Sequence, residues 1–254
     1  MSEPSTIEKT PESDAMPSTR PLKALLAAGL VAGLIAWLGG EASRDLFQPR
    51  RRPVNAKGIT LLVASPRQQE VAEERNAGLA FVWLGASLGG CLGIAGGLVR
   101  RDRRSGLRAS GFGLVAGALG CAAVSLALLP LYDSYRRGHP DEASRDLMYP
   151  LLVHAGIWSI AGAAGGAAFA LGLGRRKGIA QAAIGGLVGA IAGTIAYELI
   201  GVAAFPNAAT TQFVSSSWPT RLMARGAVAL LAALGIAEAM KPTRAPAQRG
   251  STIS

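Results

Sequence analysis

The chain carries a few ionisable residues inside long apolar stretches, where a charge is costly and so marks a functional candidate. The main ones are Glu198, Arg225 and His154. Glu198 lies about two turns, or 9–10 Å, inside one end of its stretch, and Arg225 lies at comparable depth in the next. We therefore predict a polar cluster with a Glu198–Arg225 ion pair, with His154 on the same side and Glu41 and Glu142 at its rim.

A cluster of this composition has two interpretations. As a functional site facing the outside, it would bind a proton, a cation or a small polar solute. As a structural feature, it would be a salt bridge near the membrane interface, with His154 an ordinary interfacial side chain. The residue types alone do not choose between them.

Catalytic and metal-binding motifs are missing from the sequence. There is no Walker loop, HExxH or GxSxG pattern, and the only histidines are His139 and His154. Cys91 and Cys121 form no CxxC motif and lie inside apolar runs, which is typical of small buried residues. We expect no enzyme activity, no cofactor and no metal.

The elements that would position these residues are apolar stretches of about the length that crosses a bilayer. Half of the 254 residues are hydrophobic and only 17% are charged, and backbone groups in lipid must pair within a helix. We predict an all-α membrane protein in which residues 21–240 form one domain of six transmembrane helices. The stretches are 22–40, 77–99, 107–131, 150–173, 179–205 and 220–240.

The two ends of the chain, residues 1–20 and 241–254, are polar and rich in Ser, Thr and Pro, and we predict disordered tails there. A cleaved signal peptide is the alternative for the first stretch. The long acidic leader before it and the lack of an A-x-A site after it favour a retained helix.

The distribution of arginine and lysine predicts the orientation in the membrane. Short loops at 100–108 and 175–177 are strongly basic, whereas 206–219 carries no charge. The positive-inside rule places the basic loops and both termini in the cytoplasm of a cell whose inner or plasma membrane holds the protein. The net charge of +10 then reflects contact with anionic lipid, and we expect no nucleic-acid binding.

Residues 41–76 would form an extracytoplasmic loop with some order of its own. Ser65 followed by Pro66 is a helix-start signal, with the Ser65 hydroxyl as the cap, so the second helix should begin near Pro66 and project beyond the membrane. Residues 58–64, GITLLVA, fit a short strand or an interfacial segment.

An internal repeat is indicated by the peptide EASRDL, which occurs at 41–46 and at 142–147. In each copy a proline follows eight residues after the glutamate, and Glu198 with Pro206 shows the same interval. We predict three parallel hairpins, 22–99, 107–173 and 179–240, around a pseudo-threefold axis. Coincidence among helices rich in Gly, Ala and Leu is the alternative.

Glycines recur at every fourth position in two stretches and so line one face of each helix. Such stripes allow backbones to approach closely, within a chain or between chains, and we predict glycine-zipper packing there. The residues are Gly85, Gly89, Gly93, Gly97, Gly185, Gly189 and Gly193.

These features favour a non-enzymatic structural or assembly component that is embedded in the lipid bilayer and pairs with a second copy or another membrane protein. The alternative is a channel or transporter for an ion or small solute that uses the outward-facing cluster. A third reading is an enzyme that acts on lipid or envelope material through the 41–76 loop.

Overall fold

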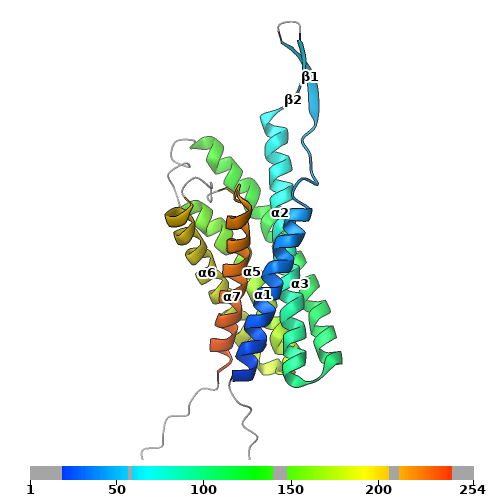
Figure 1. The fold of residues 1–254 in the computed structure, drawn as a ribbon, viewed down its shortest axis with the longest axis vertical. Helices are drawn as coiled ribbons and strands as arrows, with labels where there is room; N and C mark the ends of the chain where they lie inside the picture. Colours follow the sequence, from blue (N-terminus) through cyan, green and yellow to red (C-terminus); the bar gives the residue numbers. More distant parts are fainter. Residues whose placement is uncertain (1–18, 57–58, 140–147, 206–211, 242–254) are drawn as a thin grey trace, which may run out of the picture.

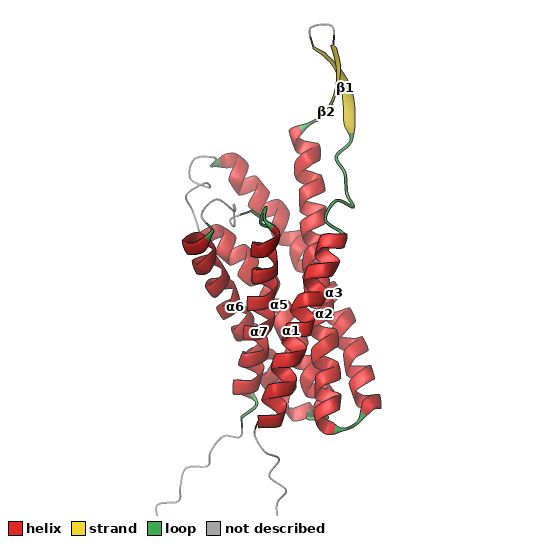
Figure 2. Ribbon diagram, in the orientation of Figure 1, coloured by secondary structure: helices red, strands yellow, loops and turns green. Residues whose placement is uncertain are grey.

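The computed structural model describes residues 19–56, 59–139, 148–205 and 212–241. Within these residues, six helices are long and apolar enough to cross a membrane. The chain is an all-α, multi-pass membrane protein, and the described strands lie in one hairpin outside the bundle (Figure 2). In chain order the elements are α1 (Thr19–Ala42), β1 (Arg51–Ala56), β2 (Ile59–Ala64), α2 (Pro66–Arg100), α3 (Arg103–Gly138), α5 (Met148–Leu173), the 3-10 turn η1 (Arg176–Gly178), α6 (Ile179–Ala204) and α7 (Trp218–Ala239) (Figure 1).

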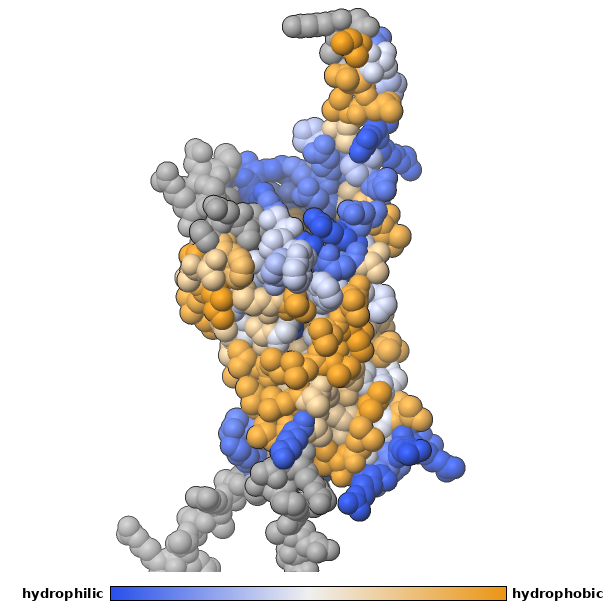
Figure 3. All heavy atoms as spheres, in the orientation of Figure 1, coloured by the Kyte–Doolittle hydropathy of each residue, from blue (hydrophilic) through white to orange (hydrophobic). Residues whose placement is uncertain are grey.

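The helices run up and down between the two ends of the bundle (Figure 1). The start of α1, the α2–α3 turn, η1 and the end of α7 share one end, which we call the turn end; the β1–β2 hairpin projects from the other, the hairpin end. A broad apolar band separates the two ends on the visible face (Figure 3). Most of the two predicted tails, and Glu142 with its copy of EASRDL, lie outside the described residues.

The helices contact one another in a ring, in the order α1, α2, α3, α5, α6, α7 and back to α1. Helices α2 and α5 also pack against each other across the middle, which makes them the most buried pair. A pseudo-threefold axis would give α7 the same contacts with α2 and α5, but its contacts with both are sparse. The ring order agrees with three successive hairpins, but the contacts of α7 do not have the threefold symmetry that we predicted. The internal repeat in the sequence stays a prediction.

Glycine faces form the contact between α2 and α3. A Cβ atom added at Gly89 would lie against the backbone of Gly113, and one added at Gly85 would lie against Gly117, closer than real Cβ atoms approach. The glycines of α6 meet α7 in the same way, since a Cβ at Gly189 would meet the Leu231 carbonyl. Each of these helix pairs therefore packs backbone against backbone.

Helices α2 and α3 are longer than the bilayer requires. Their 35 and 36 residues correspond to about 50 Å each, against ~30 Å of hydrocarbon. Helix α2 begins at Pro66, as predicted, but the Ser65 hydroxyl makes no capping bond; the Ser65 carbonyl instead accepts from the backbone N–H groups of Gln68 and Gln69.

Helix α3 continues beyond its predicted end at residue 131 to Gly138. The polar continuation is held by tertiary contacts: Arg137 pairs with Asp133 and with Glu70 of α2, and Tyr132 is buried and stacks on Tyr149 of α5. The predicted end was too early because it was based on the hydropathy of this helix alone, which does not include contacts with α2 and α5.

Residues 59–64 of the stretch GITLLVA form a strand, one of its two predicted structures. Strand β2 pairs antiparallel with β1, with Arg51 opposite Ala64 and Ala56 opposite Ile59. The hairpin stands beyond the end of α2, away from the bundle (Figure 1).

Candidate functional site

The polar residues predicted inside the membrane gather at the hairpin end of the bundle. His154 of α5 and Glu198 of α6 are both buried, at 4% and 7% exposed. His154 Nδ1 lies 2.8 Å from Glu198 Oε1, and Nε2 lies 3.3 Å from the Phe213 carbonyl oxygen. The structure thus pairs Glu198 with His154 rather than with Arg225.

Both ring nitrogens of His154 face oxygen atoms. The Phe213 carbonyl can only accept, so a hydrogen bond at that contact is donated by Nε2, and the closer Nδ1–Oε1 contact takes one hydrogen between its two atoms.

Aromatic rings enclose the histidine. Trp158, one turn further along α5, stacks on His154 at 4.9 Å between ring centroids, and Phe81 of α2 meets both rings edge-on. Tyr197 of α6 packs against Trp158 at 5.7 Å. The apolar walls strengthen electrostatic interactions inside the site by excluding water.

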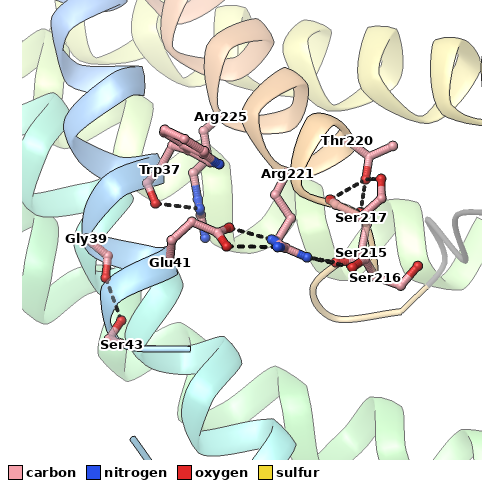
Figure 4. A network of polar contacts seen from close by, with 10 residues as sticks. All are labelled: Trp37, Gly39, Glu41, Ser43, Ser215, Ser216, Ser217, Thr220, Arg221 and Arg225. Carbon is pink, nitrogen blue, oxygen red and sulfur yellow. Dashed lines mark hydrogen bonds and ion pairs between the residues drawn. The ribbon is translucent and has the colours of Figure 1, made fainter. Parts of the chain in front are cut away.

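A second charged pair joins the first and last helices. Arg221 of α7 donates from Nε to Glu41 Oε1 at 2.5 Å and from Nη2 to Glu41 Oε2 at 2.8 Å, a two-pronged contact with the end of α1 (Figure 4). Its Nη1 donates to the carbonyls of Ser215 and Ser216 at 2.9 and 2.8 Å. Arg221 therefore holds α1, α7 and the loop before α7 together.

That loop is fixed by its own hydroxyl groups. Ser217 stands at the N-cap position of α7 with extended backbone but makes no side-chain capping bond. Thr220 Oγ1 donates to the Ser217 carbonyl at 2.9 Å, and the Ser217 and Thr220 hydroxyls lie 2.7 Å apart. Phe213 and Ser215 are buried. The uncharged segment before α7 thus returns into the bundle and supplies part of the site.

Arg225 lies one turn deeper than Arg221 and has much weaker contacts. It is 6% exposed, and its guanidinium packs directly on Gly40 of α1, where a Cβ atom would overlap it. Its hydrogen bond is a long one, 3.4 Å from Nη1 to the Trp37 carbonyl. Within the described residues, no carboxylate lies within ion-pair distance of Arg225.

Two neighbouring cavities lie at this cluster, one nearer the hairpin end and one deeper in the bundle. The outer one, of about 330 Å³, is lined by residues that include Arg44, Glu73, Arg136 and Arg221. The inner one, of about 30 Å³, is lined by His154, Trp158, Tyr197, Arg221 and Arg225 together with apolar side chains. They share a wall made of Phe213, Val214, Ser215 and Arg221.

Four of the five predicted cluster residues thus lie around one site, namely His154, Glu198, Arg225 and Glu41. Sequence reasoning missed Arg221, Trp158 and the Phe213 loop. Arg221 and Arg225 are four residues apart on one face of α7, a spacing that could have revealed the second arginine.

The next feature is the placement of possible metal ligands and of the two cysteines in the described ranges. No group of three or more His, Cys, Asp and Glu side chains there is placed to hold a metal ion. Cys91 and Cys121 are free thiols, and Cys121 is buried against Gly85 with its sulfur 3.7 Å from the Ile157 carbonyl. The site therefore consists of the hydrogen-bonded His154–Glu198 pair, the Arg221–Glu41 ion pair, and Arg225, which has one long hydrogen bond.

Comparison of the chain with protein-family models, with curated proteins and with solved structures finds no match.

Proposed function

We propose that this chain is a non-enzymatic component of a membrane assembly, held in the inner or plasma membrane with both termini in the cytoplasm. The observation that carries the proposal is the uncovered apolar surface of the hairpin, where Ile59 and Leu62 are each 64% exposed. Leu61, Leu62 and Val63 are consecutive and all exposed, so both faces of β2 are apolar. Apolar surface of this kind outside the bilayer marks a protein–protein contact.

The partner that fits this surface best is a second copy of the chain. Strand β1 carries Arg51, Arg52 and Pro53, which repel a like strand and remove a backbone donor. Strand β2, ITLLVA, has neither charge nor proline along its free edge. Two β2 edges would pair antiparallel, bury their leucines and leave the arginines outside.

The six-helix bundle would serve such an assembly as a stiff base. We interpret the glycine stripes of α2 and α6 as zippers that hold α3 and α7, because their missing side chains let the backbones meet. Close packing of this kind resists relative movement of the helices.

Cysteine cross-linking in native membranes tests the proposed contact. In a chain whose Cys91 and Cys121 are replaced by alanine, Leu62→Cys should give a disulfide-linked dimer on mild oxidation. Leu126→Cys, on α3 and 78% exposed, is the matched control and should stay monomeric. Equal cross-linking of both variants, or a monomer alone in native mass spectrometry, would contradict the proposal.

A second candidate function is transport of a small solute or ion through the outward-facing site. The two neighbouring cavities between the hairpin end and His154 favour it. In reconstituted vesicles, Glu198→Gln should then abolish flux, because an amide can neither carry a negative charge nor take up and release a proton. Glu238→Gln, at the exposed turn end of α7, is the control that should leave flux intact. Unchanged flux in Glu198→Gln would remove this candidate.

A further inference from the structure

We infer that the inner cavity binds one small monovalent inorganic anion of the size of chloride, held by Arg225. The inference starts from the partners of the buried polar side chains. His154 and Glu198 contact each other, and Arg221 is paired with Glu41. Arg225 is the remaining cation of the cluster, and its side chain has no carboxylate partner among the described residues.

Burying an unpaired guanidinium is costly, and proteins normally offset that cost with a carboxylate or a bound anion. Arg225 has one long hydrogen bond, to the Trp37 carbonyl. Figure 4 shows both Glu41 oxygens directed to Arg221 and none to Arg225. Several N–H groups of Arg225 therefore have no hydrogen-bond partner among the residues that the structure describes.

The charged side chains in the wall of the inner cavity are donors. Besides Arg225 the wall includes Arg221, Tyr197 and His154, whose ring nitrogens already face oxygens, and no carboxylate residue lines it. Apart from Ser215, the remaining wall is apolar and includes Phe81 and Leu84. A cation bound here would meet two arginines, whereas an anion would meet a charge-assisted donor.

Size and access narrow the class of anion. About 30 Å³ holds one halide-sized ion or one water molecule and excludes a lipid headgroup or an organic acid. A single guanidinium without a carboxylate partner matches a monovalent ion. Entry would pass through the outer cavity, whose wall includes Arg44 and Arg136, and past the shared Arg221.

Anion titration of the purified, detergent-solubilised protein tests the site. Starting in sodium gluconate, added chloride or bromide should give a saturable change in tryptophan fluorescence, because Trp37 and Trp158 both lie beside Arg225 or its cavity. It should also raise the unfolding temperature. Arg225→Gln should weaken the apparent affinity by at least about tenfold, and Arg225→Lys should recover part of it.

Arg108→Gln, an exposed arginine at the turn end of α3, is the control and should leave the titration unchanged. Anomalous scattering from a bromide-soaked crystal gives a readout that needs no variant, and the expected peak lies beside Arg225. A linear response to chloride, or a titration that Arg225→Gln does not alter, or bromide density absent from the cavity, would mean that the cavity holds water and would overturn the inference.

The anion site is independent of the assembly proposed above, because the titration uses solubilised protein in any oligomeric state. Failure to cross-link through Leu62 would leave the titration result standing. Failure to bind chloride would leave the cross-linking result standing.

Discussion

At the scale of single residues, what matters in this protein is how buried polar atoms find partners. His154 has both ring nitrogens occupied, and Arg221 uses four of its N–H groups on Glu41 and two carbonyls. A buried donor or acceptor left alone costs more than a hydrogen bond gains. Substitutions here should therefore be ranked by the atoms that they leave unpaired rather than by charge.

The His154–Glu198 pair gives a direct test of this ranking. Glu198→Gln keeps the shape and can donate from its amide to Nδ1, so thermal unfolding in detergent should change by less than about 1 kcal/mol. Glu198→Leu leaves Nδ1 without a partner and should cost about 2–3 kcal/mol. Equal losses in the two variants would show that the pair is held by charge and not by hydrogen bonding.

At the scale of helices, the closest contacts of the bundle are made by residues without side chains. Gly85, Gly89, Gly93 and Gly97 of α2 all meet the backbone of α3 or residues beside it, and the α2–α3 turn closes this hairpin with Arg101 in the left-handed region and Asp102 as the cap of α3. Side-chain volume there would force the two helices apart.

Two glycine-to-alanine changes separate packing from intrinsic helix preference. At Gly89 a Cβ would strike the backbone of Gly113, so Gly89→Ala should lower stability by about 1–3 kcal/mol. At Gly111 of α3 nothing lies within 4 Å, and alanine there should be neutral or slightly stabilising. Thermal unfolding of both variants measures the difference, and a tolerated Gly89→Ala would argue against backbone contact between α2 and α3.

Much of this architecture could be predicted from the sequence, because hydropathy and helix-start signals act locally. Four of the six helices begin and end close to their apolar stretches, and α2 starts at Pro66 as its Ser-Pro signal indicated. The partner of Glu198 could not be predicted, since it depends on how α5, α6 and α7 are rotated against one another. The inward course of Phe213 and Ser215 likewise has no local signal.

At the scale of the whole molecule, the polar ends and the apolar band define one orientation axis. The described ends of the chain and the arginine-rich turns share the turn end, while the hairpin occupies the other (Figures 1 and 3). The positive-inside rule applied to Arg100, Arg101, Arg103 and Arg104 predicts that the turn end faces the cytoplasm.

Labelling with a membrane-impermeant maleimide tests that orientation in intact cells. In the chain without its natural cysteines, Thr60→Cys on the exposed hairpin should react at once. Arg104→Cys, exposed at the turn end, should react only after the membrane is opened. The reverse pattern would invert the topology and would place both polar cavities on the cytoplasmic side.

The length of α2 has a mechanical consequence for whatever the hairpin touches. Roughly 20 Å of the helix rises beyond the hydrocarbon, and the Arg137–Glu70 contact braces it against α3. The hairpin is thus carried by a rigid helix rather than by a flexible loop, and its height above the lipid is set by the number of helical turns in α2. A partner on the hairpin would be kept clear of the headgroups, and at a fixed distance from the mouth of the outer cavity.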